Sequence, residues 1–169
     1  VTIVKVSGSG TALPVVQKLA EAYTQKHPDT QLQFASGTNS GGAIQGVVKG
    51  NLDLAVVNRP LSKSEAKESL AYNPFARDRF VFVAHKPSPV KDLSTEQVRD
   101  IYNGKLTNWQ QLGGRSAPII VLDRYPDESA RKFGLIPFMQ GREVKAQTVV
   151  LSKAKEIVKA LESTPYSLG

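Results

Sequence analysis

The sequence predicts an α/β fold in two lobes, each with a parallel-core sheet flanked by helices. Short apolar segments with strand character alternate with segments of helical periodicity along the whole chain. Residues 52–57 form a near-continuous apolar run, which is typical of a buried parallel strand. A proline-rich stretch near residue 87 interrupts the alternation. We therefore predict a first lobe over residues 1–78, a crossing strand and linker over 79–89, and a second lobe over 90–169.

In the first lobe, the first two predicted strands end in turns rich in glycine and hydroxyl residues. Pro14 fits the first turn of a helix, where its missing N–H needs no partner. Ser62 and Glu65 have the spacing of a capping box, which indicates another helix start. The predicted elements are strands over 2–6, 31–35 and 52–57, and helices over 14–26, 43–49 and 63–71.

The second lobe continues the alternation after a crossing strand over 79–85. Ser94 and Gln97 form a second capping box, and Ser152 is expected to cap the last helix. Trp109 is expected to be a packing residue. The predicted elements of this lobe are strands over 119–122 and 146–151, and helices over 94–103, 128–139 and 152–161.

The composition favours a small anionic partner. The 169 residues carry a formal net charge of +7. Lysine and arginine are spread along the chain and only 7% of residues are aromatic, which weighs against nucleic acid. No apolar run approaches the ~20 residues of a membrane helix, so we expect no direct membrane insertion. The absence of cysteine suits a periplasmic or extracellular location.

Two strand–turn–helix arrangements supply the candidate anion-binding groups of the first lobe. Glycine lets the backbone approach a ligand closely, the helix start offers unpaired N–H groups, and hydroxyls add directional donors. After adjacent parallel strands, both turns lie on the sheet edge where open α/β sheets bind ligands. The alternative is that these turns only cap helices. The candidate donors are Ser9, Thr11, the Ala12 N–H, Ser40 and the Gly41 N–H.

Further candidates follow the later strands. Asn58 and Arg59 come directly after the third strand. Arg124 and Arg131 could each clamp an oxyanion with two parallel N–H bonds, and Ser129 could donate from a helix start. The alternative for each arginine is a solvated residue of a loop or helix.

The motifs of enzymes are absent from the sequence. Gly8-Ser9-Gly10 begins a dinucleotide-binding pattern, but Leu13 replaces its third glycine. Ser40 does not lie in a GxSxG elbow, and neither His27 nor His85 has the spacing of a metal ligand. We therefore predict no catalytic residues, no cofactor and no metal.

The most specific segment of the chain spans residues 101–109, Ile-Tyr-Asn-Gly-Lys-Leu-Thr-Asn-Trp. Further distinctive segments are 8–14, 40–44, 53–55, 58–61 and 164–169. Through these segments, essentially the whole chain resembles a known family, the phosphate-binding proteins of ABC transporters, a PstS-like branch of the type 2 periplasmic binding proteins. Thr164-Pro165-Tyr166-Ser167-Leu168-Gly169 is similar to that family's T-P-G-A-I-G segment.

The resemblance implies a two-lobed periplasmic-binding-protein fold that holds a dehydrated oxyanion, with phosphate as the leading candidate, for a membrane ABC permease. It implies Thr11, Ala12 and Ser40 as first-lobe ligands, with Arg124 and Ser129 in the second lobe. Asn58 stands where the family often has an aspartate, and Arg131 stands where it has a hydroxyl residue. The resemblance also implies that the C-terminal return crossing is missing. A sensor or surface-interaction module with the same fold is the alternative function.

Overall fold

Each half of the alternating pattern forms its own three-stranded parallel sheet. The computed structural model describes residues 1–36, 38–86 and 88–169, in two units, Val1–Arg77 and Asp78–Gly169. Gly37 of the second glycine turn and Pro87 of the predicted linker lie outside the described residues. Both units follow one topology, in which the first strand is central: the sheet orders are β2-β1-β3 and β5-β4-β6.

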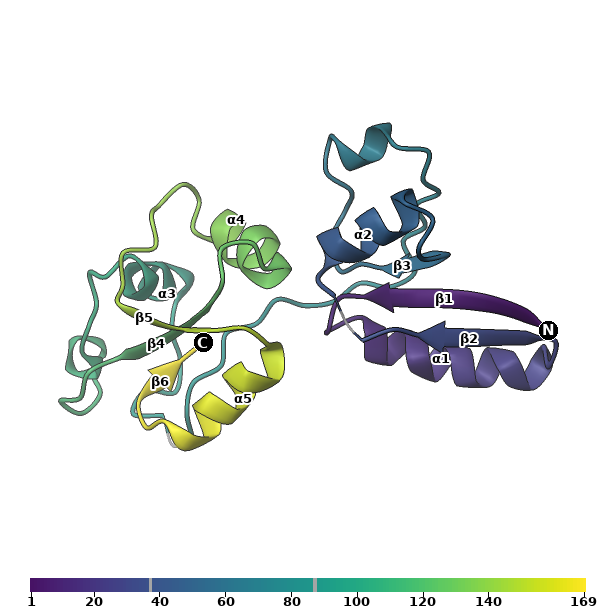
Figure 1. The fold of residues 1–169 in the computed structure, drawn as a ribbon. Helices are drawn as coiled ribbons and strands as arrows, with labels where there is room; N and C mark the ends of the chain where they lie inside the picture. Colours follow the sequence, from purple (N-terminus) through teal and green to yellow (C-terminus); the bar gives the residue numbers. More distant parts are fainter. Residues whose placement is uncertain (37, 87) are drawn as a thin grey trace. The chain divides into compact units, whose positions relative to one another are not determined.

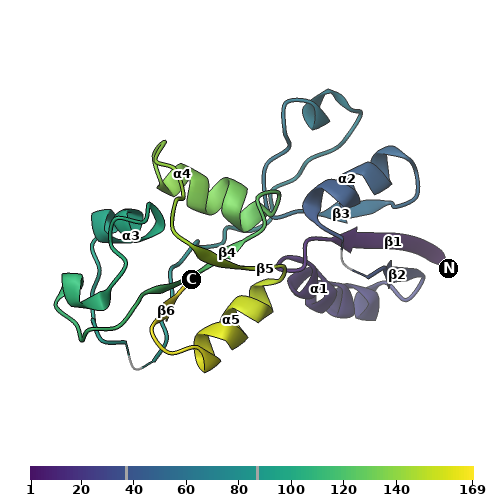
Figure 2. The same cartoon turned by 60° about the vertical axis from the view of Figure 1, so that its left-hand side comes forward.

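Unit 1 consists of two consecutive β–α–β crossovers. Figures 1 and 2 show α1 and α2 on opposite faces of its sheet. Its strands are paired in parallel, with Val6 of β1 opposite both Phe34 and Leu54. The elements are β1 (Thr2–Gly8), α1 (Leu13–Lys26), β2 (Thr30–Phe34), α2 (Ser40–Val48) and β3 (Leu54–Val56).

Gly8 is required where β1 meets β3. A β-carbon built on Gly8 would lie 2.1 Å from the Val56 carbonyl oxygen. This close approach lets the Ser9 N–H donate to the same oxygen at 2.9 Å. The backbone therefore passes from β1 into the first turn without leaving the sheet edge.

Unit 2 repeats the arrangement with a larger core. Figure 1 shows α4 and α5 on opposite faces of its sheet. The core cluster contains Ile101, Tyr102, Trp109 and Met139, each 2% exposed or less. The elements are α3 (Thr95–Tyr102), β4 (Ile120–Arg124), α4 (Ile136–Phe138), β5 (Thr148–Leu151), α5 (Ala154–Ser163) and β6 (Ser167–Leu168), with a π-helical segment, Arg131–Leu135, leading into α4.

Two predicted elements are wrong. Residues 63–71 form only a 3₁₀ turn at Glu65–Lys67, because the segment has no apolar face and a short helix in water needs packing to persist. The crossing strand over 79–85 is reduced to a bridge at Ala84, antiparallel to Leu168. Its pairing is short because β6 offers only two residues.

A helix forms within the predicted range 128–139, but part of it is a π-helix. Its helical residues begin at Ser129 and widen to a π-helix at Arg131–Leu135. The Phe80 ring packs closely against this segment at Gly134, because a β-carbon on Gly134 would lie 2.4 Å from the ring. The predicted capping box of Ser94 and Gln97 is present, and it confirms the start of α3.

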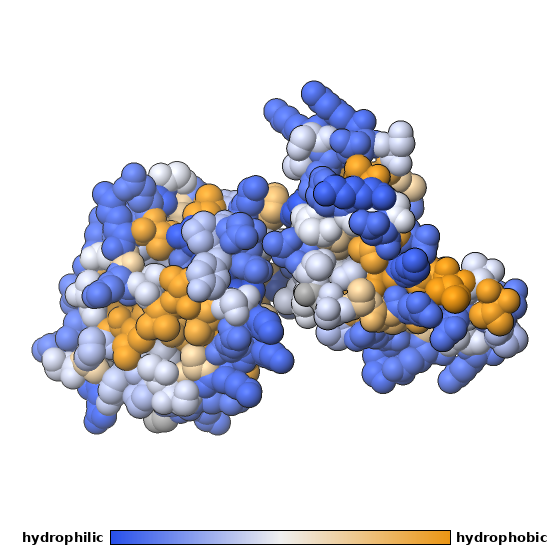
Figure 3. All heavy atoms as spheres, in the orientation of Figure 1, coloured by the Kyte–Doolittle hydropathy of each residue, from blue (hydrophilic) through white to orange (hydrophobic). Residues whose placement is uncertain are grey.

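The two units differ in how much apolar surface they bury. The core cluster of unit 1 has three buried members, Val6, Leu13 and Val56. In α1, Val15, Leu19 and Tyr23 are about half exposed, and Figure 3 shows apolar atoms at the surface of both units. Most of the buried apolar core therefore belongs to unit 2. No helix formed by residues that the structure describes has both the length and the apolar character to cross a membrane.

Candidate functional site

Four of the predicted site residues form one hydrogen-bonded chain in unit 1. The Ser9 and Thr11 hydroxyls lie 2.9 Å apart, and Asn58 Nδ2 donates to Thr11 Oγ1 at 2.9 Å. Ser40 Oγ donates to Asn58 Oδ1, also at 2.9 Å. These residues come from the ends of β1 and β3 and the first residue of α2. The carboxyl edge of the sheet therefore brings them together, as expected of a parallel α/β sheet.

The directions of these hydrogen bonds indicate different roles for Ser40 and Thr11. Ser40 is 2% exposed and directs its proton to Asn58, so in this structure it holds the amide in place. Thr11 accepts from Asn58 and keeps its own proton, which it can donate to Ser9 or to an anion. We predicted both hydroxyls as direct donors, and the geometry favours Thr11 for that role.

The backbone donors also differ from one another. The Ala12 N–H, a predicted ligand donor, donates to the Ser9 carbonyl oxygen at 3.2 Å. Gly41 lies in the first turn of α2, where N–H groups lack acceptors within the helix. Sequence reasoning missed the cap of this helix: Asn39 Oδ1 accepts from the Gly42 N–H at 2.8 Å. The spacing of Asn39 before a glycine-rich helix start could have identified it.

Arg59 forms a two-pronged ion pair with Glu65. Its Nη1 and Nη2 atoms each lie 2.7 Å from a carboxylate oxygen of Glu65, and both side chains are nearly buried. The Arg59 guanidinium holds the pKa of Glu65 down at about 2, and the carboxylate raises the pKa of Arg59. Nη2 also lies 3.8 Å from the position of a β-carbon on Gly41. The pair therefore holds the Arg59 guanidinium beside the start of α2, with its charge balanced by Glu65.

The Arg59–Glu65 pair makes unit 1 sensitive to acid. Because the folded pKa of Glu65 lies below its ordinary value of 4.5, its stabilisation is complete above that value and is lost as the pH falls toward 2. We expect Glu65→Gln to lower the urea midpoint of unit 1 at pH 7 and to show a smaller deficit at pH 2.5, where much of the Glu65 stabilisation has been lost. Unfolding followed by NMR at both pH values checks this. A Glu65→Gln deficit that persists unchanged in acid would contradict it, and exposed Glu68→Gln is the control.

In unit 2, Arg124 ends β4 and is held by two acceptors. Its Nη2 donates to Glu128 Oε2 at 2.9 Å and to the Ser152 carbonyl at 2.8 Å. Its side chain is 13% exposed. Among the residues that the structure describes, its Nε is the one buried side-chain polar atom without a hydrogen-bond partner. Two of the guanidinium's hydrogen bonds are therefore satisfied within unit 2, and its Nε has no acceptor among the described residues.

Arg131 is fixed by a different carboxylate. Its Nε donates to Asp123 Oδ2 at 2.8 Å, and Asp123 is buried within β4. Burial raises the pKa of Tyr102, and the nearby charge of Asp123 adds to this effect. Ser129 begins the helical segment that carries Arg131. Sequence reasoning missed Asp123, Glu128 and Ser152 as partners of the arginines, although Arg124 and Glu128 have the spacing of a helical ion pair.

The chain matches a family model along nearly its full length. The model describes a PBP superfamily domain and covers residues 1–168. Among solved structures, a putative phosphate ABC transporter substrate-binding protein from Clostridium perfringens with bound phosphate is 30% identical, with a TM-score of 0.86 over 99% of this chain and 69% of that one. An ABC-type phosphate transport receptor from Vibrio cholerae is 27% identical, with a TM-score of 0.66 over 98% of this chain and 69% of that one.

The curated relatives of the chain include proteins named as phosphate-binding proteins. A phosphate-binding protein PstS 2 from Streptococcus agalactiae is 33% identical over 64% of this chain and 37% of its own length. The phosphate-binding protein PstS of Bacillus subtilis is 26% identical over 97% of this chain and 55% of its own length. The chain therefore spans roughly a third to a half of these two relatives.

Proposed function

The chain belongs to the PBP superfamily and to its PstS-like phosphate-binding branch. We propose that it is a binding protein for phosphate or a similar tetrahedral oxyanion. The observation that carries the proposal is the hydrogen-bonded chain of Ser9, Thr11, Asn58 and Ser40 at the carboxyl edge of the first sheet. It places hydroxyl and amide donors beside a helix start, which is a favourable environment for an anion.

We propose candidate anion donors for each unit taken by itself. In unit 1, Thr11 and Ser9 donate through their hydroxyls, and the Gly41 N–H donates from the start of α2, with Arg59 as a further candidate. In unit 2, the candidate donor is the guanidinium of Arg124, which ends β4. Ser129 and Arg131 are the secondary candidates.

The wider role that we propose is delivery of the anion to a membrane ABC permease, outside the cytoplasm. The two solved structures named above are described as a phosphate ABC transporter substrate-binding protein and an ABC-type phosphate transport receptor, which supports binding without turnover. Their names also support phosphate over other oxyanions, and the basic net charge of +7 favours an anionic ligand in general.

Phosphate binding should depend on the two hydroxyls. We expect Thr11→Val and Ser40→Ala each to weaken it by ~1–3 kcal/mol, because a charged acceptor or its supporting amide is left underpaired. Isothermal titration calorimetry with inorganic phosphate measures this, with Thr2→Val, at an exposed threonine of the same unit, as the matched control. Wild-type affinity in both variants would refute the site assignment.

Asn58 should set how phosphate is distinguished from sulfate. At neutral pH, phosphate carries a proton that a carboxylate can accept, and sulfate carries none. We expect Asn58→Asp to weaken sulfate binding at least ~10-fold more than phosphate binding, since an unpaired charge repulsion costs over ~1 kcal/mol. Competition calorimetry with both anions tests this. Equal losses for both anions would show that residue 58 does not face the ligand.

A further inference from the structure

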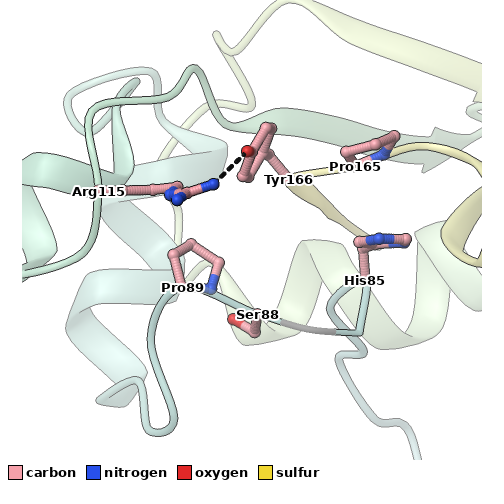
Figure 4. A pocket seen from close by; sticks show the side chains of 6 residues that line it. All are labelled: His85, Ser88, Pro89, Arg115, Pro165 and Tyr166. Carbon is pink, nitrogen blue, oxygen red and sulfur yellow. Dashed lines mark hydrogen bonds between the residues drawn. The ribbon is translucent and has the colours of Figure 1, made fainter.

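Unit 2 contains a cavity that is separate from the residues assigned to phosphate. It has a volume of about 420 Å³, within the range of small-molecule sites. Tyr166 lies at its rim, just before β6, and the Tyr166 carbonyl accepts from the N–H of Ile120, the first residue of β4. Arg124 ends that same strand, so the cavity lies at the opposite edge of the sheet. Its lining residues are His85, Ser88, Pro89, Arg115, Pro165 and Tyr166 (Figure 4).

Tyr166 is held in a strained backbone conformation at this cavity. Its φ is 65°, in the left-handed region that bulky side chains rarely adopt. Two hydrogen bonds maintain it, because its carbonyl accepts from Trp109 Nε1 at 2.9 Å and from the Ile120 N–H at 3.2 Å. Strain of this kind persists only where the surroundings enforce it, and it is common at ligand sites. Here its effect is to place a phenol on the cavity wall.

Arg115 is positioned against the same phenol. Its Nη1 donates to the Tyr166 hydroxyl oxygen at 3.1 Å (Figure 4). The preceding Gly114 packs tightly, since a β-carbon there would lie 3.1 Å from Pro89. No carboxylate of the described chain forms an ion pair with Arg115. Its charge is therefore available to a ligand.

His85 supplies a second polar group. Its Nδ1 lies 2.6 Å from the Leu161 carbonyl oxygen, which can only accept, so Nδ1 carries a proton. Nε2 has no hydrogen-bond partner among residues 1–36, 38–86 and 88–169. Figure 4 shows the imidazole on a different side of the cavity from Arg115 and the Tyr166 hydroxyl.

We propose that this cavity binds a small organic carboxylate with an apolar body. The side-chain hydrogen bond of Arg115 to Tyr166 uses Nη1, and the parallel N–H groups of a guanidinium match the two oxygens of a carboxylate. Pro89, Pro165 and the Tyr166 ring form apolar walls for the body of the ligand. Arg115 is the only lysine or arginine that lines the described cavity, which suits a monoanion better than phosphate.

The test uses benzoate and hexanoate as probes of the whole chain. The two histidines lie in different units, so NMR signals of the His27 ring serve as the internal reference for those of His85. We expect both probes to shift the His85 signals and not those of His27. Benzamide, the neutral analogue, should bind at least ~10-fold more weakly than benzoate, because it lacks the charge that Arg115 recognises.

Two matched variants separate binding from folding. Arg115→Gln should weaken benzoate at least ~10-fold, whereas Arg79→Gln, at an exposed arginine of the same unit, should bind like the wild type. Both should keep wild-type circular dichroism and wild-type phosphate affinity. Equal benzoate affinity in the two variants, or no selective shift of His85 by either probe, would overturn the proposal. Neither outcome bears on phosphate binding, so the two functions are tested separately.

Discussion

Replacing Trp109 by alanine is expected to destabilise unit 2 by ~3–5 kcal/mol, the range for large aromatic residues removed from a core. Trp109 is fully buried and belongs to the main hydrophobic cluster. Its indole N–H also donates to the Tyr166 carbonyl at 2.9 Å. The substitution therefore leaves a cavity and removes one of the two hydrogen bonds to the Tyr166 carbonyl, which keeps only the Ile120 N–H at 3.2 Å.

Urea unfolding followed by NMR measures this effect residue by residue. Signals of unit 1 act as an internal reference, since its core contains no residue of the Trp109 cluster. Trp109→Phe should lose less than Trp109→Ala, because it retains most of the ring volume. Val158→Ala, at an exposed position of α5, should change stability by less than ~0.5 kcal/mol. A midpoint shift of Trp109→Ala no larger than that of Val158→Ala would disprove the packing role.

Arg124→Lys is expected to weaken phosphate binding by about 30-fold or more, which corresponds to ~2 kcal/mol or more. A lysine cannot reproduce the planar fork of donors that matches two oxygens of a tetrahedral anion. Since the loss concerns contacts in the bound state, the dissociation rate should carry most of it.

Arg131→Lys is the discriminating comparison. Arg131 pairs through Nε with the buried Asp123, and a lysine can still neutralise that carboxylate. We expect its phosphate affinity to change by less than about threefold, or ~0.7 kcal/mol. Stopped-flow dissociation of phosphate from both variants measures the difference, with exposed Arg79→Lys as the control. If Arg131→Lys loses more affinity than Arg124→Lys, then Arg131 is the clamp.

Local sequence signals were sufficient for much of the fold and for part of the candidate site. The glycine turn after β1, the proline in the first turn of α1 and the capping box of α3 are each encoded within a few residues. Parallel alternation then places Ser9, Thr11, Ser40 and Asn58 at one edge, because the carboxyl ends of parallel strands meet there. This inference needs no knowledge of side-chain contacts.

The hydrogen-bond partners of the charged side chains follow from the tertiary structure and not from the sequence pattern. Glu65 has the spacing of a cap, and it does accept from the Ser62 N–H, but it also accepts two hydrogen bonds from Arg59 at the same distance of 2.7 Å. A capping pattern cannot reveal this, because it says nothing about a nearby arginine that turns toward the same carboxylate. The helix predicted after Ser62 does not form for a related reason. Capping residues favour the start of a helix, but a short helix needs tertiary packing to be stable.

The same distinction holds in unit 2. Residues 119–131 alone indicate that a basic cluster follows a strand and opens a helix, since these are local features. The contact of Arg124 with Ser152 and the left-handed backbone of Tyr166, held by Trp109, depend on elements that are distant in sequence. Glu128 and Asp123 are near their arginines in sequence, and the fold selects which arginine each carboxylate meets. The energies of these contacts come from burial and from long-range hydrogen bonds, which no periodicity or short motif records.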